Sequence, residues 1–206
     1  MTNTNTSESD WRDGFLFVGN HPALDFVNTR PVIVGEPQEL LPDWRSLVRW
    51  FQAAGLIDSR AAQALERGWT HSSESRKTVE AMRNFREALR KELLAWEDGA
   101  PVRNAMIHEL NRLMSEHPML SKVSSNKGKL AKTPWLPLER PSDLFAPLAD
   151  AAAQLFSELS RERVRKCAHC VIHFRDVSKI GTRRWCSLRL CGNRLKVAAY
   201  AARRKK

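Results

Sequence analysis

Long hydrophobic runs and secretion signals are missing from this chain of 206 residues. No stretch approaches 18 consecutive apolar residues, and the first residues, MTNTNTSESDWRDG, have neither the basic start nor the apolar core of a signal peptide. These absences argue against a membrane protein and predict a cytoplasmic location. The polar residues 1–13 offer little to pack, and we expect them to form a disordered tail.

Familiar catalytic and nucleotide-binding motifs are also absent. The sequence contains no GxSxG, no phosphate-binding loop, no dinucleotide fingerprint and no HExxH. We therefore expect no enzymatic activity. The alternative, an unrecognised enzyme in the N-terminal region, would need a deep polar pocket around Asp25 and Asn28.

Cysteine and excess positive charge occur in one region only. All four cysteines lie in the last 41 residues, from Lys166 to Lys206. A reducing cytoplasm disfavours structural disulfides, which leaves metal binding or redox chemistry as their use. From Arg161 to Lys206 the chain has 15 Lys/Arg against Glu162 and Asp176, a net charge of +13, whereas the first 160 residues have 19 against 21, a net charge of −2. The basic character therefore belongs to a small C-terminal module.

The rest of the chain has the composition of a globular domain. Its length suits one ordinary domain plus a small appendage, and a hydrophobic content of 42% is enough to bury a core. Apolar residues recur mainly three or four positions apart, which is the period of an amphipathic helix. We predict an α+β fold that is mainly helical, with a helix-rich domain over residues 14–160 and the basic module over residues 161–206.

Periodicity, capping residues and turn residues together predict the elements of the large domain. Helices are expected from Asp43 to Gly55, from Asp58 or Ser59 to Gly68, within residues 72–99, from Pro101 to His117, and from Ser142 or Asp143 to Val164. The segment FLFVGNHPALDFVNT, residues 15–29, predicts two short extended or buried pieces around an Asn-His-Pro break. Ser-Ser-Asn-Lys-Gly between two apolar arms predicts a β-hairpin between Pro118 and Pro141.

The four cysteines have the spacing of a structural zinc site, with a CxxC pair, fifteen intervening residues and a CxxxxC pair: Cys167, Cys170, Cys186 and Cys191. A closed tetrahedral site takes four soft ligands at about 2.3 Å, and a CxxC pair reaches one metal from one tight turn. A module of this size with few large apolar groups cannot stay folded by its core alone. A structural zinc contributes about 10–16 kcal/mol to folding and can supply what is missing. We therefore predict one structural Zn²⁺. Two alternatives stay open, namely a redox CxxC pair, and His169 or His173 in place of one cysteine.

The order of parts in the module predicts a treble-clef-like finger. A CxxC knuckle is followed by an expected hairpin over residues 171–185 that turns at SKIG, and then by a helix after Cys191. Residues five apart on a helix point about 140° away from each other, so two such cysteines cannot both lie in one regular helix and bind one ion. Cys186 is therefore expected just ahead of the helix, with Ser187 or Gly192 near the break.

Two strings in the sequence resemble a known bacterial family. RRWCSLRLCGNRLKVAAYAARR resembles the CGNR zinc-finger signature, and ALDFVNT resembles the opening motif of the ABATE domain that accompanies this finger. The resemblance covers essentially the whole chain after the tail. It implies a stress-induced or ligand-responsive transcription regulator, in which a helix-rich domain senses an effector or a partner and a zinc finger binds DNA. A direct helical connection over residues 160–166 is expected to link the two parts.

The cations of the module predict a nucleic-acid contact, because duplex phosphates attract such a surface. Asn193 and Arg194 are the candidates for reading base edges, since Asn pairs with adenine and Arg with guanine. The full set of candidate contacts is Arg183, Arg184, Arg189, Asn193, Arg194, Lys196, Arg203 and Arg204. DNA is the expected partner, which would place the protein at the nucleoid when it is bound. An RNA-binding protein and a protein-interaction adaptor are the alternatives.

Asp25 and Asn28 are the candidate ligand site of the N-terminal region. Both lie among apolar neighbours in ALDFVNT, and buried polar side chains need hydrogen-bond partners. They could bind a small effector, or they could cap or brace the fold.

Overall fold

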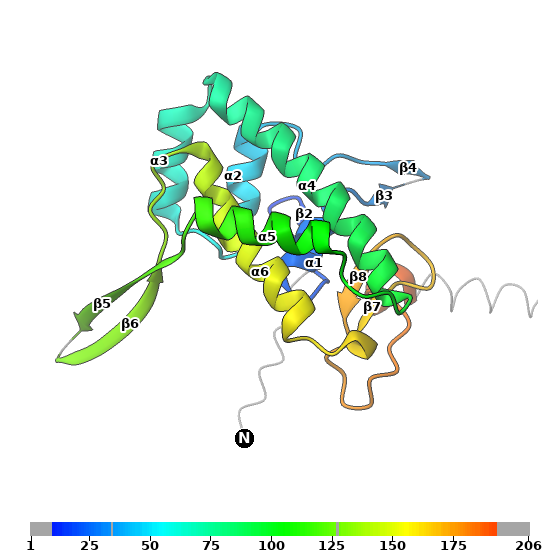
Figure 1. The fold of residues 1–206 in the computed structure, drawn as a ribbon. Coiled ribbons are helices and arrows are strands. Elements are labelled where there is room, and N and C mark those ends of the chain that lie inside the picture. The colour runs from blue at the N-terminus through cyan, green and yellow to red at the C-terminus, as the bar shows by residue number, and fades with distance from the viewer. Residues whose placement is uncertain (1–9, 34, 127, 193–206) are drawn as a thin grey trace, which may run out of the picture.

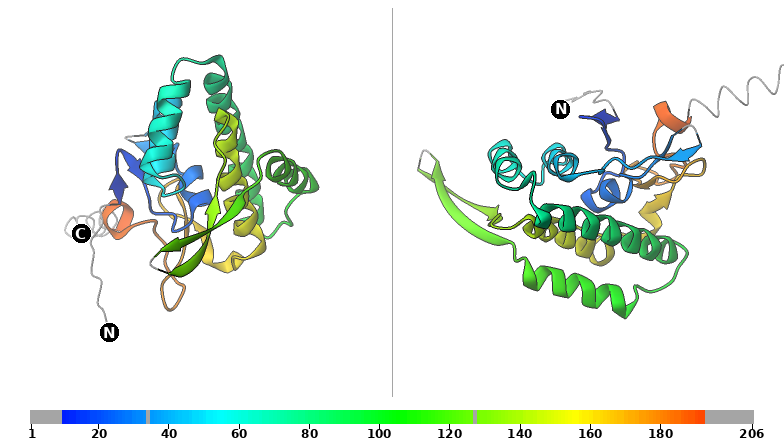
Figure 2. Two further views of the ribbon diagram at one scale, coloured as in Figure 1. Left: turned by 90° about the vertical axis from the view of Figure 1, so that its left-hand side faces the viewer. Right: turned by 90° about the horizontal axis from the view of Figure 1, so that it is seen from above.

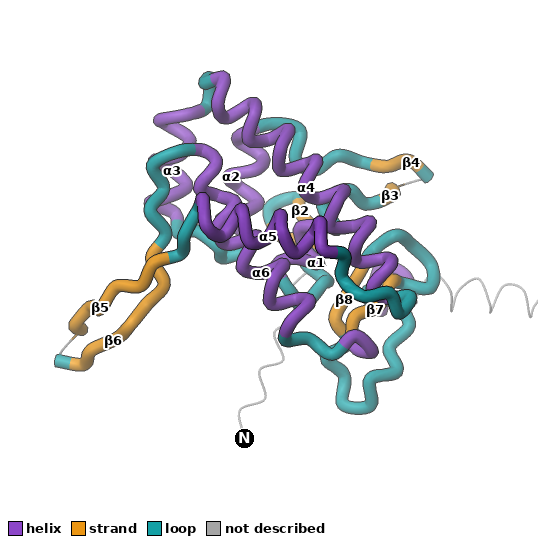
Figure 3. The backbone as a smooth tube through the Cα atoms, viewed as in Figure 1, coloured by secondary structure: helices purple, strands orange, loops and turns teal. Residues whose placement is uncertain are grey.

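The computed structural model describes residues 10–33, 35–126 and 128–192 (Figure 1). Its helices are α1 (Pro22–Val27), α2 (Trp44–Ala53), α3 (Ser59–Trp69), α4 (Ser73–Glu97), α5 (Asn104–Glu116) and α6 (Phe145–Ser157). Its strands form separate antiparallel pairs (Figure 3): β1 (Trp11–Arg12) with β2 (Phe15–Leu16), β3 (Val32–Ile33) with β4 (Glu36–Pro37), β5 (Leu120–Asn126) with β6 (Lys129–Trp135), and β7 (Val164–Lys166) with β8 (His173–Arg175). The α+β, mainly helical fold class is confirmed.

Helices α2 and α3 begin at the capping residues that the sequence indicated. The side chain of Asp43 accepts a hydrogen bond from the backbone N–H of Ser46 at 2.8 Å, and Asp58 accepts one from Ala61 at 2.8 Å. Such caps satisfy backbone donors that have no partner within the helix. Gly55 follows α2 with φ +73°, a left-handed conformation that favours glycine. Both predicted helices are confirmed.

The helices pack around one hydrophobic core, and α4 provides its longest side. The apolar stripe of α4 is buried throughout: Val79, Met82, Phe85, Leu89, Leu93 and Trp96. Aromatic rings connect the helices, since Phe26 of α1 lies 5.5 Å from Trp50 of α2, and Phe85 lies 5.9 Å from Phe145 of α6 between ring centroids. The core therefore holds the short helix α1 firmly between longer ones.

A buried ion pair fixes the chain just after α1. The side chain of Arg86 in α4 is 2% exposed, and its Nη2 lies 2.5 Å from Oε2 of Glu39. Its Nη1 donates to the hydroxyl of Thr29 at 3.0 Å. A buried charge needs such partners, because loss of water is otherwise not compensated. Arg86 thereby positions the end of the ALDFVNT segment.

Residues 15–29 form two short buried pieces as expected, whereas one helix begins later than expected. The first piece is the strand β2 and the second is the helix α1, with Pro22 at a position where a missing N–H costs nothing. Helix α5 begins at Asn104 rather than Pro101, because the backbone N–H of Arg103 donates to Oε1 of Glu92 at 2.7 Å instead of joining a helical turn.

Helix α6 is shorter than predicted. A 3₁₀ turn over Pro141–Leu144 precedes it, and the carboxylate of Asp143 accepts backbone hydrogen bonds there instead of capping α6. The chain leaves α6 after Ser157 and reaches the cysteines through a second 3₁₀ turn, Arg161–Arg163, and β7. The predicted helical connection over residues 160–166 is therefore wrong, because β7 pairs with β8.

The start of the domain and its long hairpin can be compared with the sequence-based expectations. Ordered structure begins before the predicted boundary at residue 14, since β1 pairs with β2 and Asp13 accepts a hydrogen bond from Arg49 at 2.9 Å; residues 1–9 lie outside the described ranges. The predicted hairpin between Pro118 and Pro141 is confirmed as β5 and β6, which extend away from the helices (Figures 1 and 2). Across the described ranges, no helix has both the length and the hydropathy of a transmembrane segment.

Candidate metal centre and nucleic-acid interface

Four sulfur atoms meet near the C-terminal end of the described chain. The Sγ atoms of Cys167, Cys170, Cys186 and Cys191 all lie within 4.8 Å of one another. Cys170 lies 3.7 Å from Cys186 and 3.6 Å from Cys191, and these last two lie 3.6 Å apart, measured between sulfurs. A tetrahedral site with Zn–S bonds of about 2.3 Å requires sulfurs about 3.8 Å apart. The arrangement fits one zinc ion.

Short strands and a loop, rather than a hairpin after the first pair, bring the cysteines together. Cys167 follows β7, and its N–H donates to the carbonyl of Ile172 at 2.8 Å, which closes the CxxC turn before β8. The N–H of Ala168 donates to the carbonyl of Arg184 at 3.0 Å, which ties the returning chain to this turn. The hairpin expected over residues 171–185 is therefore replaced by β7 and β8, which flank the CxxC pair, and by a loop.

The second pair lies at the start of a helical turn. Cys186 precedes this turn, Leu188–Gly192, and Cys191 lies within it. The hydroxyl of Ser187 accepts a hydrogen bond from the N–H of Arg189 at 3.1 Å, so Ser187 marks the break that the spacing required. The helix predicted after Cys191 falls on residues 193–206, which lie outside the described ranges.

The pKa values of the thiols show why the cluster suits a cation. Hydrogen bonds from Cys170 and Cys186 hold the pKa of Cys167 far below its ordinary value. The hydrogen bond between Cys170 and Cys167 raises the pKa of Cys170 to about 12. Hydrogen bonds with the same two cysteines, together with burial, raise the pKa of Cys186. The closeness of the four thiols and their burial thus disfavour the simultaneous deprotonation of several of them. A bound Zn²⁺ compensates this charge, because zinc takes cysteine as thiolate.

The two nearby histidines lie outside this sulfur cluster. His169 is exposed on the CxxC turn. The ring of His173 is buried, and its Nδ1 lies 2.9 Å from Oε1 of Glu97 at the end of α4. Among the described residues the four cysteines form the cluster without a histidine.

The small hydrophobic core of the finger is completed from the start of the chain. Leu16 and Val18 are buried in one cluster with Ile172, Phe174 and three of the cysteines. Ser187 also donates to the carboxylate of Asp10 at 2.5 Å. The finger is therefore packed against the N-terminal strands, although more than 140 residues separate them in the sequence.

The ALDFVNT segment holds the outer edge of β8. The side-chain N–H of Asn28 donates to the carbonyl of His173 at 2.8 Å, and its oxygen accepts the N–H of His173 at 2.9 Å. One residue pair further along, the N–H of Arg175 donates to the carbonyl of Gly19 at 2.8 Å. Asn28 is 1% exposed and braces the finger, which is the alternative to ligand binding that the sequence left open.

Asp25 shapes the same junction from inside. Its Oδ1 accepts the N–H of Gly19 at 2.7 Å, and burial raises the pKa of this carboxyl to about 7. A side chain at Gly19 would come within 2.8 Å of both Oδ1 of Asp25 and Cβ of Leu24, so only glycine allows this approach. Asp25 therefore makes a structural contact at the position for which the sequence also allowed a ligand.

Three of the predicted DNA contacts lie around one groove on the finger. The groove encloses about 920 Å³ and is lined by Asp10, Ser178, Ile180, Thr182, Arg183, Arg184, Trp185, Ser187, Leu188 and Arg189. Arg184 and Arg189 are exposed there. Arg183 is half-buried, and its Nε donates to the carbonyl of Trp185 at 2.7 Å. The remaining candidates, Asn193, Arg194, Lys196, Arg203 and Arg204, lie outside the described ranges.

Comparison with protein-family models identifies both parts of the chain. Residues 20–158 match the ABATE family, described as "putative stress-induced transcription regulator". The chain belongs to the ABATE family. Residues 163–204 of this ABATE protein match the CGNR zinc finger, and this finger with its clustered cysteines takes one structural zinc ion. Both matched families are of regulator or zinc-finger type, and a comparison with curated proteins found no match.

Sequence reasoning missed the residues that join the ABATE domain to the finger. Gly19, Leu16 and Val18 were not singled out, because contacts across such a separation leave no periodic pattern. A partial signal was present in Asn28, since a polar side chain among apolar neighbours requires a partner. That partner proves to be the backbone of β8.

Proposed function

We propose that this ABATE protein is a zinc-dependent DNA-binding transcription regulator. The observation that carries the proposal is the groove of about 920 Å³ on the finger, with Arg184 and Arg189 exposed at its border. The groove belongs to a module whose net charge of +13 greatly exceeds that of the rest of the chain. Duplex phosphates are the partner with complementary charge and repeat.

In this proposal Cys167, Cys170, Cys186 and Cys191 hold the zinc. When bound, the ion supplies the cross-link that a module with a small core needs in order to stay folded. The cysteine pairs then fix the two segments that present cations, the loop carrying Arg184 and the helical turn carrying Arg189. These arginines bind phosphates, and Asn193 and Arg194 of the CGNR motif read base edges.

We further propose that the helical domain, residues 14–160, senses an effector or a partner and changes how the finger, residues 161–206, is presented. Its support is the direct contact of the two parts, since Asn28 and Glu97 of the helical domain both bond His173 of the finger. Regulation through these contacts requires two states with different affinities for DNA. The proposed location is the cytoplasm, at the nucleoid when bound.

The test is selection of random duplex DNA by the purified, zinc-quantified protein, followed by sequencing, with an RNA pool at the same salt. Enrichment of a short duplex motif supports the regulator. Enrichment from the RNA pool alone would replace it with an RNA-binding protein. A protein with one zinc per chain that enriches neither pool would instead be an adaptor whose finger docks an acidic protein.

A further inference from the structure

The hairpin of β5 and β6 is an arm that stands away from the helices. Seven residue pairs, from Leu120–Trp135 to Asn126–Lys129, give it a length of about 23 Å at ~3.3 Å per residue. Its described side chains are exposed, apart from the half-buried Thr133. The right view of Figure 2 shows the arm extending past the helical body. Such a ribbon of two strands is free to enter a partner's groove.

The arm carries only positive charge. Lys122, Lys129 and Lys132 lie on its strands, and no acidic residue occurs between Glu116 and Glu139. The three lysines make no ion pair with other residues in the described part of the chain. The rest of the first 160 residues is different, since it has 21 acidic against 15 basic residues. The arm is thus a local positive surface on an otherwise acidic domain.

The register places these lysines on both faces of the ribbon. Lys122 lies opposite Thr133 and Lys129 opposite Asn126, and these pairs share one face. Lys132 lies opposite Val123, one position out of phase, and so occupies the other face. A ribbon that lies in the major groove turns one face to the base edges, and a phosphate backbone lies beside each of its two edges. Lysine side chains are long enough to reach these backbones from either face of the ribbon.

The remaining side chains of the arm suit a close approach to base edges. Ser121 and Ser125 are small, lie on the same face as Lys132, and can donate and accept hydrogen bonds. Val123 and Leu130 are 67% and 77% exposed, on the same face as Lys132. Exposed apolar side chains of this kind can contact the methyl group of thymine, and the major groove is wide enough for a two-stranded ribbon.

We propose that the β5–β6 arm inserts into the major groove of duplex DNA as a second contact beside the finger. The inference rests on the proposed DNA-binding function. The arm and the loop of residues 176–185 both point to the lower side of the molecule in Figure 1 and in the left view of Figure 2. A duplex lying along this side contacts the finger at one end of the protein and the arm at the other.

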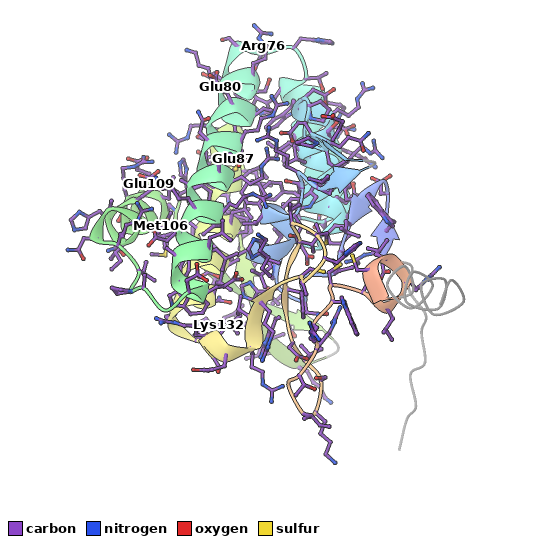
Figure 4. The ribbon with its side chains drawn as sticks, turned by 90° about the vertical axis from the view of Figure 1, so that its right-hand side faces the viewer. Arg76, Glu80, Glu87, Met106, Glu109 and Lys132 are labelled. Atoms are coloured by element: carbon purple, nitrogen blue, oxygen red, sulfur yellow. The ribbon has the colours of Figure 1, made fainter. Side chains whose placement is uncertain are left out.

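The test compares salt dependence of binding for full-length, zinc-loaded protein on a duplex of random sequence. Changing Lys122, Lys129 and Lys132 to Gln removes three cations from the arm. The slope of log K against log salt should become shallower by about 2.7, at ~0.9 per phosphate contact. The matched control changes Arg76, Lys77 and Lys91 of α4 to Gln. Figure 4 labels Arg76 at the upper end of α4 and Lys132 toward the lower side, and the control should leave the slope unchanged.

A photo-crosslinking residue at Ser125 separates direct contact from a long-range effect of charge. Crosslinks from this position to duplex DNA, together with the shallower slope, support insertion of the arm. An unchanged slope in the arm variant, while an Arg184→Ala/Arg189→Ala variant does change, would overturn the arm and leave the finger in place. A shallower slope without crosslinks would also overturn it. Absence of DNA binding by the wild-type protein would overturn the proposed function itself, and crosslinks to RNA but not to duplex DNA would assign the arm to another ligand.

Discussion

The side-chain amide of Asn28 occupies the place that a neighbouring strand would take beside His173. It pairs with the N–H and the carbonyl of the same residue, at 2.9 and 2.8 Å. An edge strand has unpaired backbone groups, and here a single side chain satisfies one pair of them. The ABATE motif is therefore a docking element for the finger as well as part of the helical domain.

Asn28→Ala should lower the free energy of unfolding by about 2–6 kcal/mol. The reason is that two buried backbone groups of His173 lose their partner, at ~1–3 kcal/mol each. Urea unfolding of the zinc-loaded protein measures the change, and a chelator assay should show faster loss of zinc. Gln52→Ala, which removes an exposed hydrogen bond to Ser59, is the control and should cost below about 0.5 kcal/mol. Equal effects of the two variants would mean that Asn28 does not brace the finger.

Cys170→Ser should abolish zinc binding and unfold the finger. Because Leu16 and Val18 are buried against the finger, we expect the β1–β2 strands to loosen with it, while α2 to α6 keep their helical signal. Metal content by a colorimetric chelator, circular dichroism and amide hydrogen exchange report these three outcomes. Ser178→Ala, in the neighbouring loop, is the control and should retain one zinc. A Cys170→Ser protein that still carries one zinc per chain would contradict the ligand assignment.

The three arginines of the finger groove should behave differently. Arg184→Ala with Arg189→Ala should make the salt slope of DNA binding shallower by about 1.8 and leave unfolding nearly unchanged, since both side chains are exposed. The guanidinium of Arg184 lies 6.0 Å from the ring of Trp185, at the outer limit of a cation–π contact. Arg183→Ala should instead destabilise the finger, because the guanidinium of Arg183 lies 4.6 Å over the ring of Phe174. Thermal unfolding and salt titration of both variants separate the two roles. Loss of stability in the Arg184/Arg189 variant would refute this division.

Asp25 should make stability fall as pH rises. Burial raises the pKa of this carboxyl from 3.8 to about 7, so between these values the folded protein holds a proton that the unfolded chain has released. The slope of unfolding free energy with pH is then negative, and the contribution of the group is lost through about pH 7. Asp25→Asn keeps an oxygen for Gly19 but cannot ionise.

We therefore expect Asp25→Asn to be more stable than the wild-type protein at pH 8, with the difference shrinking toward pH 6. Urea unfolding of both proteins across this interval measures it, and the comparison cancels the pH dependence of zinc binding. The matched change Glu80→Gln, on an exposed site of α4, should give no such trend. A constant difference between the Asp25 variant and wild type would show that this carboxyl does not titrate there.

Local chemistry made much of the fold predictable. Asp43 and Asp58 each accept a hydrogen bond from a backbone N–H three residues away, so the starts of their helices could be predicted from a few neighbouring residues. The zinc site could likewise be predicted from the sequence, because binding of one metal ion requires a particular spacing of the cysteines. The end of α6 was not, because an apolar stripe continues beyond Ser157 while pairing of β7 with β8 decides the conformation.

The junction between the two parts of the protein lies beyond such reasoning. Whether Asn28 binds a ligand or a strand depends on which segment lies beside it, and that segment is 145 residues away. Composition located the positive charge of the finger correctly. It did not show that Arg183 is held by Phe174 and Trp185 while Arg184 is exposed, because this difference arises only from the packing of the loop.

Because residues 10–18 share a core with the finger, the first strands cannot complete their packing until the C-terminal finger has been synthesised. A ribosome produces Leu16 and Val18 long before the cysteines that will cover them. These apolar residues stay without their packing partners while all the helices are synthesised, and then until the finger binds a zinc ion. In a cell short of zinc, the first strands of this protein would stay uncovered even though its helices had folded, which would turn metal supply into a signal that proteases and chaperones can detect.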